Sequence, residues 1–359
     1  MATIICNTKF KLDPFADGGS KRSVQIREYL EDNNCDYYYD SFILPKGLSA
    51  FQLMVLSIRA VIFINKYYPR NRIRSLRNYI RLVKYYALRI PVVYDKYKKS
   101  DVIFAWENTN DQNIVYLMKA TGHPVLAFPH NIESLVSLND ARSLKNEMDV
   151  LAHCDAVFAI SKEETWLLRL QGVNAYYYPY QPPKRAEEYF ITIRKKRTHR
   201  ETNGSPHYLL LGSATNVPTR EGMQTILDNV PKDANNFHLW VAGYGTDSLN
   251  CPLFSNIHFK GALSANDLEP LLVNADAIII YQPPTTGSLT RIPEMLMAGI
   301  PVIANDNAAR NYYSVDGVRV YHSIPELLEI LDTRSQVNVE GCPIDSYDRE
   351  ALNQVLRIS

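Results

Sequence analysis

Residues 285–306, TTGSLTRIPEMLMAGIPVIAND, bring together residue types that suit phosphate and sugar chemistry. Gly287 allows a tight turn, and Pro293 is typical of the first turn of a helix. The amino end of such a helix offers unpaired N–H groups and a positive dipole end, and Arg291 adds a fixed cation, which together suit a diphosphate. Glu294 lies one helical turn further on and could accept hydrogen bonds from a ribose diol. The stretch predicts a nucleotide-sugar site; a plain strand–loop–helix, with Glu294 merely complementing the helix dipole, is an equal alternative.

A second group of candidates lies in FPHNIES (128–134), at the end of a predicted strand. His130 could hydrogen-bond a sugar or an acceptor hydroxyl, and Glu133 could orient it, although a lone His at a strand end is usually structural. Glu107 and Asp111 follow another predicted strand and are weaker acid–base candidates.

A glycine-rich turn, DGGSKRS (17–23), follows the first predicted strand. The backbone amides of Gly18 and Gly19, with Lys21 and Arg22 beside them, suit an anion. An ordinary β–α turn is an equal alternative.

Apolar runs and helix-like segments alternate on both sides of residues 183–207, which are polar and charge-rich. This alternation predicts two doubly wound α/β domains with parallel sheets. Such sheets bind ligands beyond the carboxyl ends of their strands, so we expect a site in a cleft between the domains. We place an acceptor-binding domain at 1–183, a linker at 184–207, a donor-binding domain at 208–340 and a terminal helix at 341–359. Whether that helix returns to the N-terminal domain stays open.

Composition excludes several classes of protein. The net charge is +1, and the five cysteines are too far apart for a zinc cluster or a disulfide framework. The first residues lack the layout of a signal peptide, and the apolar stretch 51–65 is too short to span a bilayer and contains Arg59. We therefore expect a cytoplasmic protein.

Residues 51–99 combine an apolar start with many basic and tyrosine side chains, and Asp95 is the only acidic residue after position 59. This mixture suits contact with anionic lipid headgroups or a lipid diphosphate. A solvated helical face is the alternative, and no recognised nucleic-acid module frames the run.

Residues 208–310 resemble the donor-binding half of glycosyltransferase family 4 and related bacterial polysaccharide enzymes, which have the GT-B fold. The likeness rests on LLLGSATN, LWVAGYG, the stretch from IHFKG to YQP, and TGSLTRIPEMLMAGIPVIA, which stand in the family's order. FPHNIES is similar to a His-Asn-x-Glu motif in the same enzymes. One position departs from the pattern: of the Glu-x7-Glu pair that many members carry, the second Glu is Glu294 and the first is replaced by Thr286.

The resemblance implies a retaining, metal-independent glycosyltransferase of the hexosyltransferase type, without a cofactor. It would move sugar from a nucleotide diphosphate sugar to a glycan or lipid-linked acceptor in surface polysaccharide synthesis, with peripheral contact to the cytoplasmic membrane. The alternatives are a non-catalytic nucleotide-sugar-binding or partner-supporting relative and a GT-B-fold sugar-nucleotide epimerase. His130 and Glu133 are the implied catalytic pair. The implied donor-binding residues are Gly18, Gly19, Gly212, Ser213, Gly243, Tyr244, Lys260, Thr286, Gly287, Ser288, Leu289, Thr290, Arg291 and Glu294.

Overall fold

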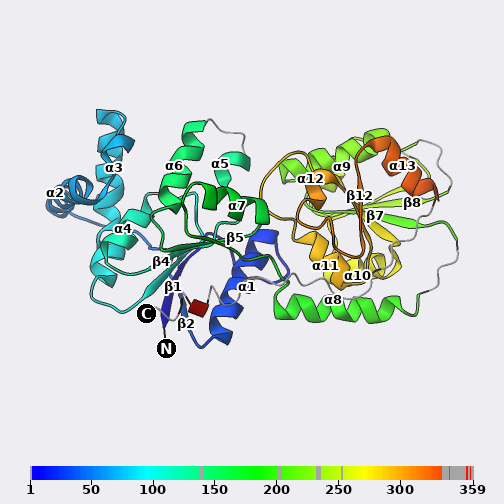
Figure 1. Ribbon diagram of the computed structural model, residues 1–359, viewed down its shortest axis with the longest axis horizontal. Helices are drawn as coiled ribbons and strands as arrows, with labels where there is room; N and C mark the ends of the chain where they lie inside the picture. Colours follow the sequence, from blue (N-terminus) through cyan, green and yellow to red (C-terminus); the bar gives the residue numbers. More distant parts are fainter. Residues whose placement is uncertain are drawn as a thin grey trace. The chain divides into compact units, whose positions relative to one another are not determined.

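The computed structural model describes residues 2–136, 141–200, 204–231, 236–251 and 254–333, together with residues 339, 353, 354 and 356 (Figure 1). The chain divides into two compact units. The first comprises Met1–Pro179 and Tyr347–Ser359, and the second comprises Tyr180–Ser346.

The first unit contains a six-stranded sheet in which every pair of neighbours is parallel. Its order is β2-β1-β3-β4-β5-β6, with β1 (Thr3–Asn7), β2 (Asp36–Tyr39), β3 (Ile103–Trp106), β4 (Val125–Ala127), β5 (Ala156–Ala159) and β6 (Ala175–Tyr177). Helices α1 (Gly18–Asp32), α4 (Ile114–Ala120), α5 (Glu133–Val136), α6 (Ala141–Leu151) and α7 (Lys162–Leu170) connect the strands. Strands β3, β4 and β5 are buried throughout, as expected for a parallel sheet with both faces covered.

The second unit contains another six-stranded parallel sheet. Its order is β12-β11-β10-β7-β8-β9, with β7 (His207–Leu211), β8 (His238–Ala242), β9 (Ile257–Gly261), β10 (Ala277–Ile280), β11 (Val302–Asn305) and β12 (Val318–Tyr321). The strands are connected by α9 (Val217–Asn229), α10 (Ala265–Asn274), α11 (Arg291–Met297) and α12 (Asp306–Ala309), with the 3₁₀ turn η3 at Thr246–Ser248, and α13 (Ile324–Thr333) follows β12. The chain runs outward from β7 in one direction and from β10 in the other, so the point where the strand order reverses lies between them. The predicted fold class, two doubly wound parallel sheets, is confirmed.

The predicted linker is wrong over most of its length. Residues Lys184–Arg197 form helix α8, whose side chains Ala186, Phe190 and Ile193 are buried in the core of the second unit. These three positions lie on one helical stripe, which the many charges around them conceal in the sequence. Arg197 fixes the end of the helix, because its guanidinium donates to the carbonyl oxygens of Leu272, Val273, Ala275 and Gly299.

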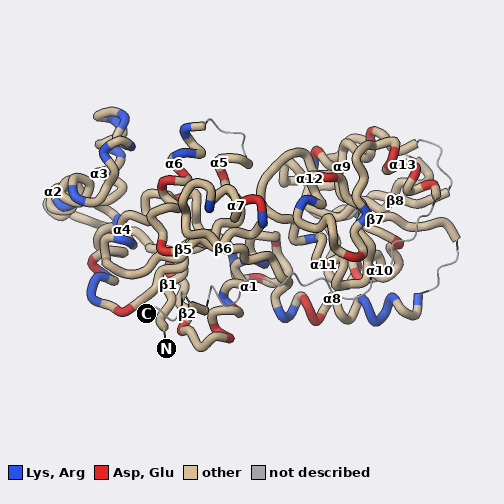
Figure 2. Tube along the Cα trace, viewed as in Figure 1, with Lys and Arg blue, Asp and Glu red and all other residues tan. Residues whose placement is uncertain are grey.

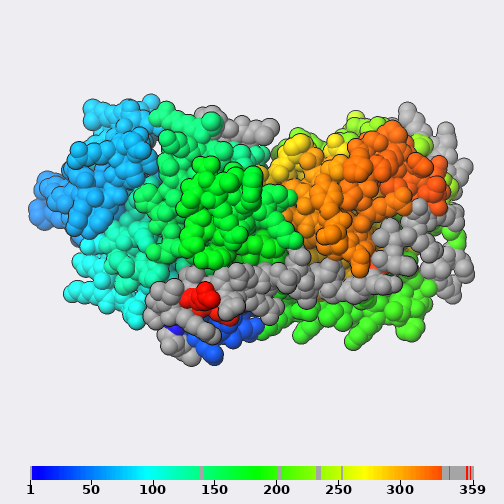
Figure 3. Space-filling view, in the orientation of Figure 1, coloured from blue at the N-terminus to red at the C-terminus, as the bar shows by residue number. Residues whose placement is uncertain are grey.

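The segment predicted at 51–99 folds into helices α2 (Ala50–Tyr67) and α3 (Leu76–Arg89), with the 3₁₀ turn η1 (Arg70–Arg72) between them and the π-helical turn η2 (Pro91–Asp95) after them. Both helices pack on each other at the surface of the first unit (Figure 3). A capping box formed by Ser49 and Gln52 begins α2 one residue before the predicted stretch.

Helix α2 is also longer than predicted. It has 18 residues with a mean hydropathy of 1.3, so by length and composition it could cross a membrane, contrary to the expectation from the sequence. One face of the helix is nevertheless packed in the core of the first unit through Leu56, Ala60, Phe63 and Ile64.

Most of the predicted terminal helix at 341–359 lies outside the described residues. Residues 353, 354 and 356 are helical. Tyr29 Oη donates to Asn353 Oδ1 over 3.1 Å, and Leu356 is buried in the core of the first unit.

Candidate functional site

Two glycine turns meet at the carboxyl edge of the second sheet. Gly212 follows β7 and Gly243 follows β8, and the Gly212 N–H donates to the Ala242 carbonyl over 3.1 Å. Gly243 has a φ of 129°, and a Cβ atom there would lie 2.0 Å from the Gly212 carbonyl oxygen. Only glycine permits this conformation and this approach, so the two turns present bare backbone beside the point where the strand order reverses.

Arg291 lies over the first of these turns. It begins α11, and its guanidinium donates through Nη1 to the Leu211 carbonyl and through Nη2 to Thr219 Oγ1, the latter over 3.4 Å. A Cβ atom on Gly212 would stand 2.3 Å from Nη1, so the arginine occupies the space that the glycine leaves. Burial lowers the pKa of Arg291 to about 10. This value is still well above 7, so the guanidinium stays charged at neutral pH. Within the described residues no carboxylate lies within ion-pair distance of Arg291, although the charge of Glu294 acts on it and partly offsets the effect of burial on its pKa.

Internal hydrogen bonds shape the loop between β10 and α11. The carbonyl of Gly287 accepts from Arg310, and Ser288 Oγ lies 2.8 Å from Tyr312 Oη. Tyr312 also donates to the Leu289 carbonyl over 3.4 Å, and Thr290 precedes α11 without capping it through its side chain. These predicted donor residues, with the half-buried Thr286, thus form one loop whose path depends on side chains that follow β11.

The remaining predicted donor residues differ in their accessibility. The Tyr244 side chain is 68% exposed, and its carbonyl accepts from Ala214 N–H over 2.8 Å, which joins the turn after β8 to the turn after β7. Ser213 Oγ pairs locally with Thr215 Oγ1 at 2.7 Å. Lys260 is exposed on β9 and precedes Gly261, whose carbonyl accepts from Gly243 N–H over 2.8 Å.

Glu294 is buried rather than open to a ligand. Only 2% of its surface is exposed to solvent, and Oε1 accepts a hydrogen bond from Tyr180 Oη over 2.7 Å. A ribose diol would therefore reach this carboxylate only if the Tyr180 side chain moved. Its role as the ribose contact stays a prediction.

In the first unit, a buried carboxylate supports His130. The carboxylate belongs to Glu107, which follows β3 and accepts from Cys6 Sγ over 2.9 Å and from Ser23 Oγ. His130 Nε2 lies 3.4 Å from Glu107 Oε2. Burial alone would raise the pKa of Glu107, but its hydrogen bonds with His130, Cys6 and Ser23 and the charge of His130 hold that pKa below its usual value. Glu107 is thus built to stay ionised and to hold the imidazole in one orientation.

Glu133, the residue expected to orient His130, lies elsewhere. It begins the short helix α5 and is half-buried, and its backbone N–H donates to Glu147 Oε1 over 2.9 Å. The neighbouring N–H of Ile132 donates to Glu164 Oε1, also over 2.9 Å. Two carboxylates from α6 and α7 therefore fix the backbone after His130, while Glu107 contacts its ring.

Gly19 serves the packing around His130. The Phe10 ring stacks on the imidazole with ring centres 4.5 Å apart, and a Cβ atom on Gly19 would lie 2.2 Å from that ring. The N–H groups of Gly19 and Ser20 both donate to the Asp17 side chain, at 2.9 and 3.1 Å. Of the two amides expected to receive a ligand anion, that of Gly19 is thus capped by the protein's own carboxylate.

Arg22 is not placed to bind an anion. It is 1% exposed and donates to Gln25 Oε1 and to the carbonyl oxygens of Tyr178 and Pro179. The two carbonyl partners follow β6 and lie more than 150 residues along the chain, so the local sequence could not predict them. Among the described residues, no group of three or more His, Cys, Asp and Glu side chains is arranged to hold a metal ion.

Neither a protein-family model nor a curated protein matches the sequence. The chain is similar to many solved structures, and three of them serve for comparison. Sucrose-phosphate synthase from Thermosynechococcus elongatus is 14% identical with a TM-score of 0.59, over 93% of this chain and 89% of that one. Anabaena HepE in complex with UDP and glucose is 12% identical with a TM-score of 0.56, over 93% and 89%. The α,α-trehalose 6-phosphate synthase of Burkholderia multivorans is 11% identical with a TM-score of 0.56, over 99% and 95%.

Such low identities establish the fold alone. The two parallel six-stranded sheets with interleaved helices match the two Rossmann-like domains of these structures. At that level the resemblance read from the sequence is confirmed: the chain has the GT-B fold of glycosyltransferases.

Proposed function

We propose that this protein is a glycosyltransferase that moves a sugar from a nucleotide diphosphate sugar to a glycan or lipid-linked acceptor. The observation that carries the proposal is Arg291, a charged guanidinium without an ion pair in the described residues, lying over the Gly212 turn where the strand order reverses. Ligands of doubly wound sheets bind at this position. HepE, a protein with the same fold, has been solved with UDP-glucose, which supports a nucleotide-sugar ligand here.

The proposed reaction uses Arg291 to stabilise the leaving diphosphate, whose negative charge grows as the bond to the anomeric carbon breaks. The bare backbone at Gly212 and Gly243 lets phosphate oxygens approach closely. The acceptor hydroxyl forms the new bond on the face that the diphosphate leaves, and its proton passes to that diphosphate. This route retains the anomeric configuration and requires neither a protein nucleophile nor a metal ion.

His130 is the proposed partner of the reacting hydroxyl or of the donor sugar. Its ring is held by Phe10 on one face and by Glu107 through Nε2. The Glu107 carboxylate fixes the direction of the imidazole, which is the positioning that a hydrogen bond to a sugar or an acceptor hydroxyl requires.

We further propose that the protein works at the cytoplasmic face of a membrane, in surface polysaccharide synthesis. Besides its buried face, α2 has a second apolar face, which is exposed. The exposed side chains recur at helical spacing: Phe51, Met54, Val55, Ile58 and Ile62. Because the opposite face packs in the protein core, this helix suits insertion along the membrane surface better than a crossing.

Helix α3 adds the charge that anionic lipids attract. Leu76 and Ile80 of this helix are also exposed, and basic residues recur along it (Figure 2). Within the described residues no ion pair involves Arg77, Arg81 or Lys84. The tyrosines of this region are less accessible than the sequence suggested, since Tyr86 is fully buried and Tyr85 donates to Asp111 over 2.6 Å.

Release of free nucleotide tests the enzyme activity. Purified protein is incubated with UDP-glucose and with GDP-mannose, with and without a membrane lipid extract as the source of acceptor. We expect nucleotide release from one donor, slow alone and faster with the extract. A protein that binds a nucleotide but never releases one from its sugar would instead be the non-catalytic relative. Thr286, which lacks the carboxylate of the family pattern, and the covered Glu294 favour that second candidate.

A further inference from the structure

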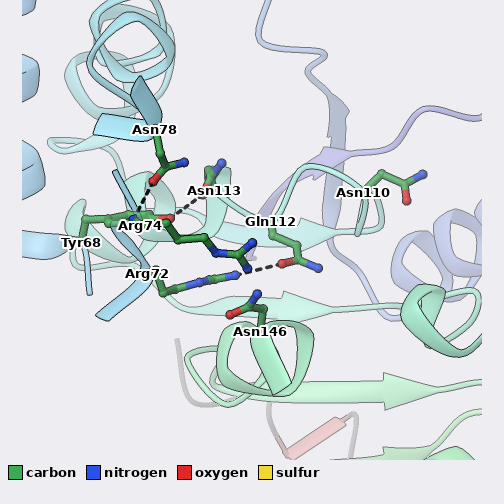
Figure 4. Close-up of a pocket in the computed structure, with 8 residues that line it drawn as sticks. All are labelled: Tyr68, Arg72, Arg74, Asn78, Asn110, Gln112, Asn113 and Asn146. Carbon is green, nitrogen blue, oxygen red and sulfur yellow. Dashed lines mark hydrogen bonds between the residues drawn. The ribbon is translucent and has the colours of Figure 1, made fainter. Parts of the chain in front are cut away.

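A polar pocket lies in the first unit between the α2–α3 pair and the loop that follows β3 (Figure 4). Its volume is about 240 Å³. Of its eight lining residues, five carry amide side chains, two are arginines and one is Tyr68. None of the eight is acidic, so the pocket concentrates positive charge and groups that both donate and accept hydrogen bonds.

The two arginines, Arg72 and Arg74, lie side by side with their guanidinium ends directed toward Gln112 (Figure 4). Arg72 is fixed, because Nη1 donates to Tyr116 Oη over 2.7 Å and Nη2 donates to Gln112 Oε1 over 3.1 Å. Arg74 is exposed, and in the described part of the chain it forms no ion pair. Two neighbouring guanidinium groups repel each other. An anion bound between them would replace this repulsion with attraction to both groups.

The amides indicate what accompanies the anion. Gln112, from the loop after β3, and Asn146, from α6, lie beside the arginines, whereas the Asn110 side chain lies farther off and points away from them (Figure 4). Sugar hydroxyls pair with amide groups in both directions, as donor and as acceptor. The volume is below the roughly 300–1,000 Å³ of pockets for drug-sized ligands, so one sugar ring fits better than a nucleotide or a longer glycan.

We propose that this pocket binds a single sugar unit carrying a phosphate or carboxylate group, as a remote part of the acceptor. The acceptor assignment rests on the proposed glycosyltransferase function, whereas the binding of an anionic sugar rests on the pocket alone. The loop after β3 links the two places, since it carries Glu107, which contacts His130, and Gln112 of the pocket. Five residues span at most about 18 Å, so one acceptor of a few sugar units can reach both.

The test is a calorimetric titration of the full chain with glucose 1-phosphate and glucuronate, with uncharged glucose as the matched ligand control. The variant is Arg74→Gln, because Arg74 is exposed and the substitution keeps the hydrogen bond from its backbone N–H to Asn78 Oδ1. Arg142→Gln is the matched protein control, since this exposed arginine lies in the first turn of α6 and does not line the pocket. A second arm measures binding to phosphatidylcholine vesicles with and without a polyprenyl phosphate, which separates a lipid-linked phosphate from a soluble acidic sugar.

We expect a charged probe to bind, glucose to bind far more weakly, and Arg74→Gln to lose affinity by about tenfold or more, with Arg142→Gln unchanged. Binding of the polyprenyl phosphate vesicles alone, lost in Arg74→Gln, would also support the pocket and assign the anion to a lipid. Equal affinity of Arg74→Gln and the wild type, equal binding of glucose, or no binding of any charged probe would overturn the inference. UDP binding by the same preparations reports on the second unit, so failure of this pocket is distinguishable from failure of the proposed function.

Discussion

Replacing Arg291 with Gln should weaken the binding of a nucleotide diphosphate by about ten- to 150-fold. The guanidinium has five N–H donors, and the protein accepts from it at Leu211 and Thr219. Within the described residues no other acceptor bonds to the guanidinium, so its remaining donors can bind a phosphate. A hydrogen bond to a charged group contributes roughly 1.5–3 kcal/mol, which corresponds to that range of affinity. The pKa of about 10 leaves Arg291 charged throughout the neutral range, so the loss should not depend on pH there.

Calorimetry with UDP or GDP, whichever the wild type binds, measures the effect. Arg319→Gln is the matched control, because it removes the same charge from the middle of β12. Gly212→Ala is a second variant that keeps the charge: its Cβ would lie 2.3 Å from Arg291 Nη1 and should displace the guanidinium. Thermal unfolding of each variant shows whether loss of the Leu211 contact has disturbed the fold. Wild-type affinity in a well-folded Arg291→Gln protein would refute the assignment of the donor site.

Three further outcomes follow from the structure. The double variant Ile58→Gln, Ile62→Gln should bind anionic vesicles about 30-fold more weakly, because about 2 kcal/mol of free energy from burying apolar side chains in the membrane is lost. Leu170→Gln on α7 is the control and should bind as the wild type does. Equal loss of binding in both proteins would contradict docking through α2. Glu107→Gln should destabilise the protein by about 1–3 kcal/mol near neutral pH. Because the folded state lowers the pKa of Glu107, its stabilisation is complete above the usual value of 4.5 and is lost as pH falls through the folded pKa. Denaturant unfolding at several pH values should therefore show the gap between wild type and variant closing in acid, and a constant gap would contradict the ionised carboxylate. Arg197→Lys should lower the melting temperature, because a lysine cannot reach four carbonyl oxygens in the geometry of a guanidinium; an unchanged value would show that those contacts contribute little.

The sheets and the donor loop could be predicted because their signals are local. Apolar runs mark most of the strands, although β2 (DYYY) and β12 (VRVY) give no such run. Gly212, Gly243 and Arg291 stand where strands end or helices begin. The order of the elements then places these residues at one edge of the sheet. The order of the elements along the chain does not show which side chains are open to solvent. The burial of Glu294 beneath Tyr180 could therefore not be predicted.

The support around His130 could not be predicted because its parts are far apart in the chain. Glu107 draws its hydrogen bonds from Cys6 and Ser23, which are 101 and 84 residues away. Glu133 has the right residue type at close spacing, yet helix α5 carries it elsewhere. The prediction that Arg22 binds an anion is wrong for the same reason. Its guanidinium donates to carbonyl oxygens of Tyr178 and Pro179, which are far from it in the chain.

The most direct test of the account is calorimetric titration of the purified, folded protein with UDP and with GDP. The account predicts binding of one of them, saturable and lost in Arg291→Gln, at a single site per chain. Binding of neither nucleotide by a protein that unfolds cooperatively would contradict the donor site in the second unit, and with it the proposed glycosyltransferase.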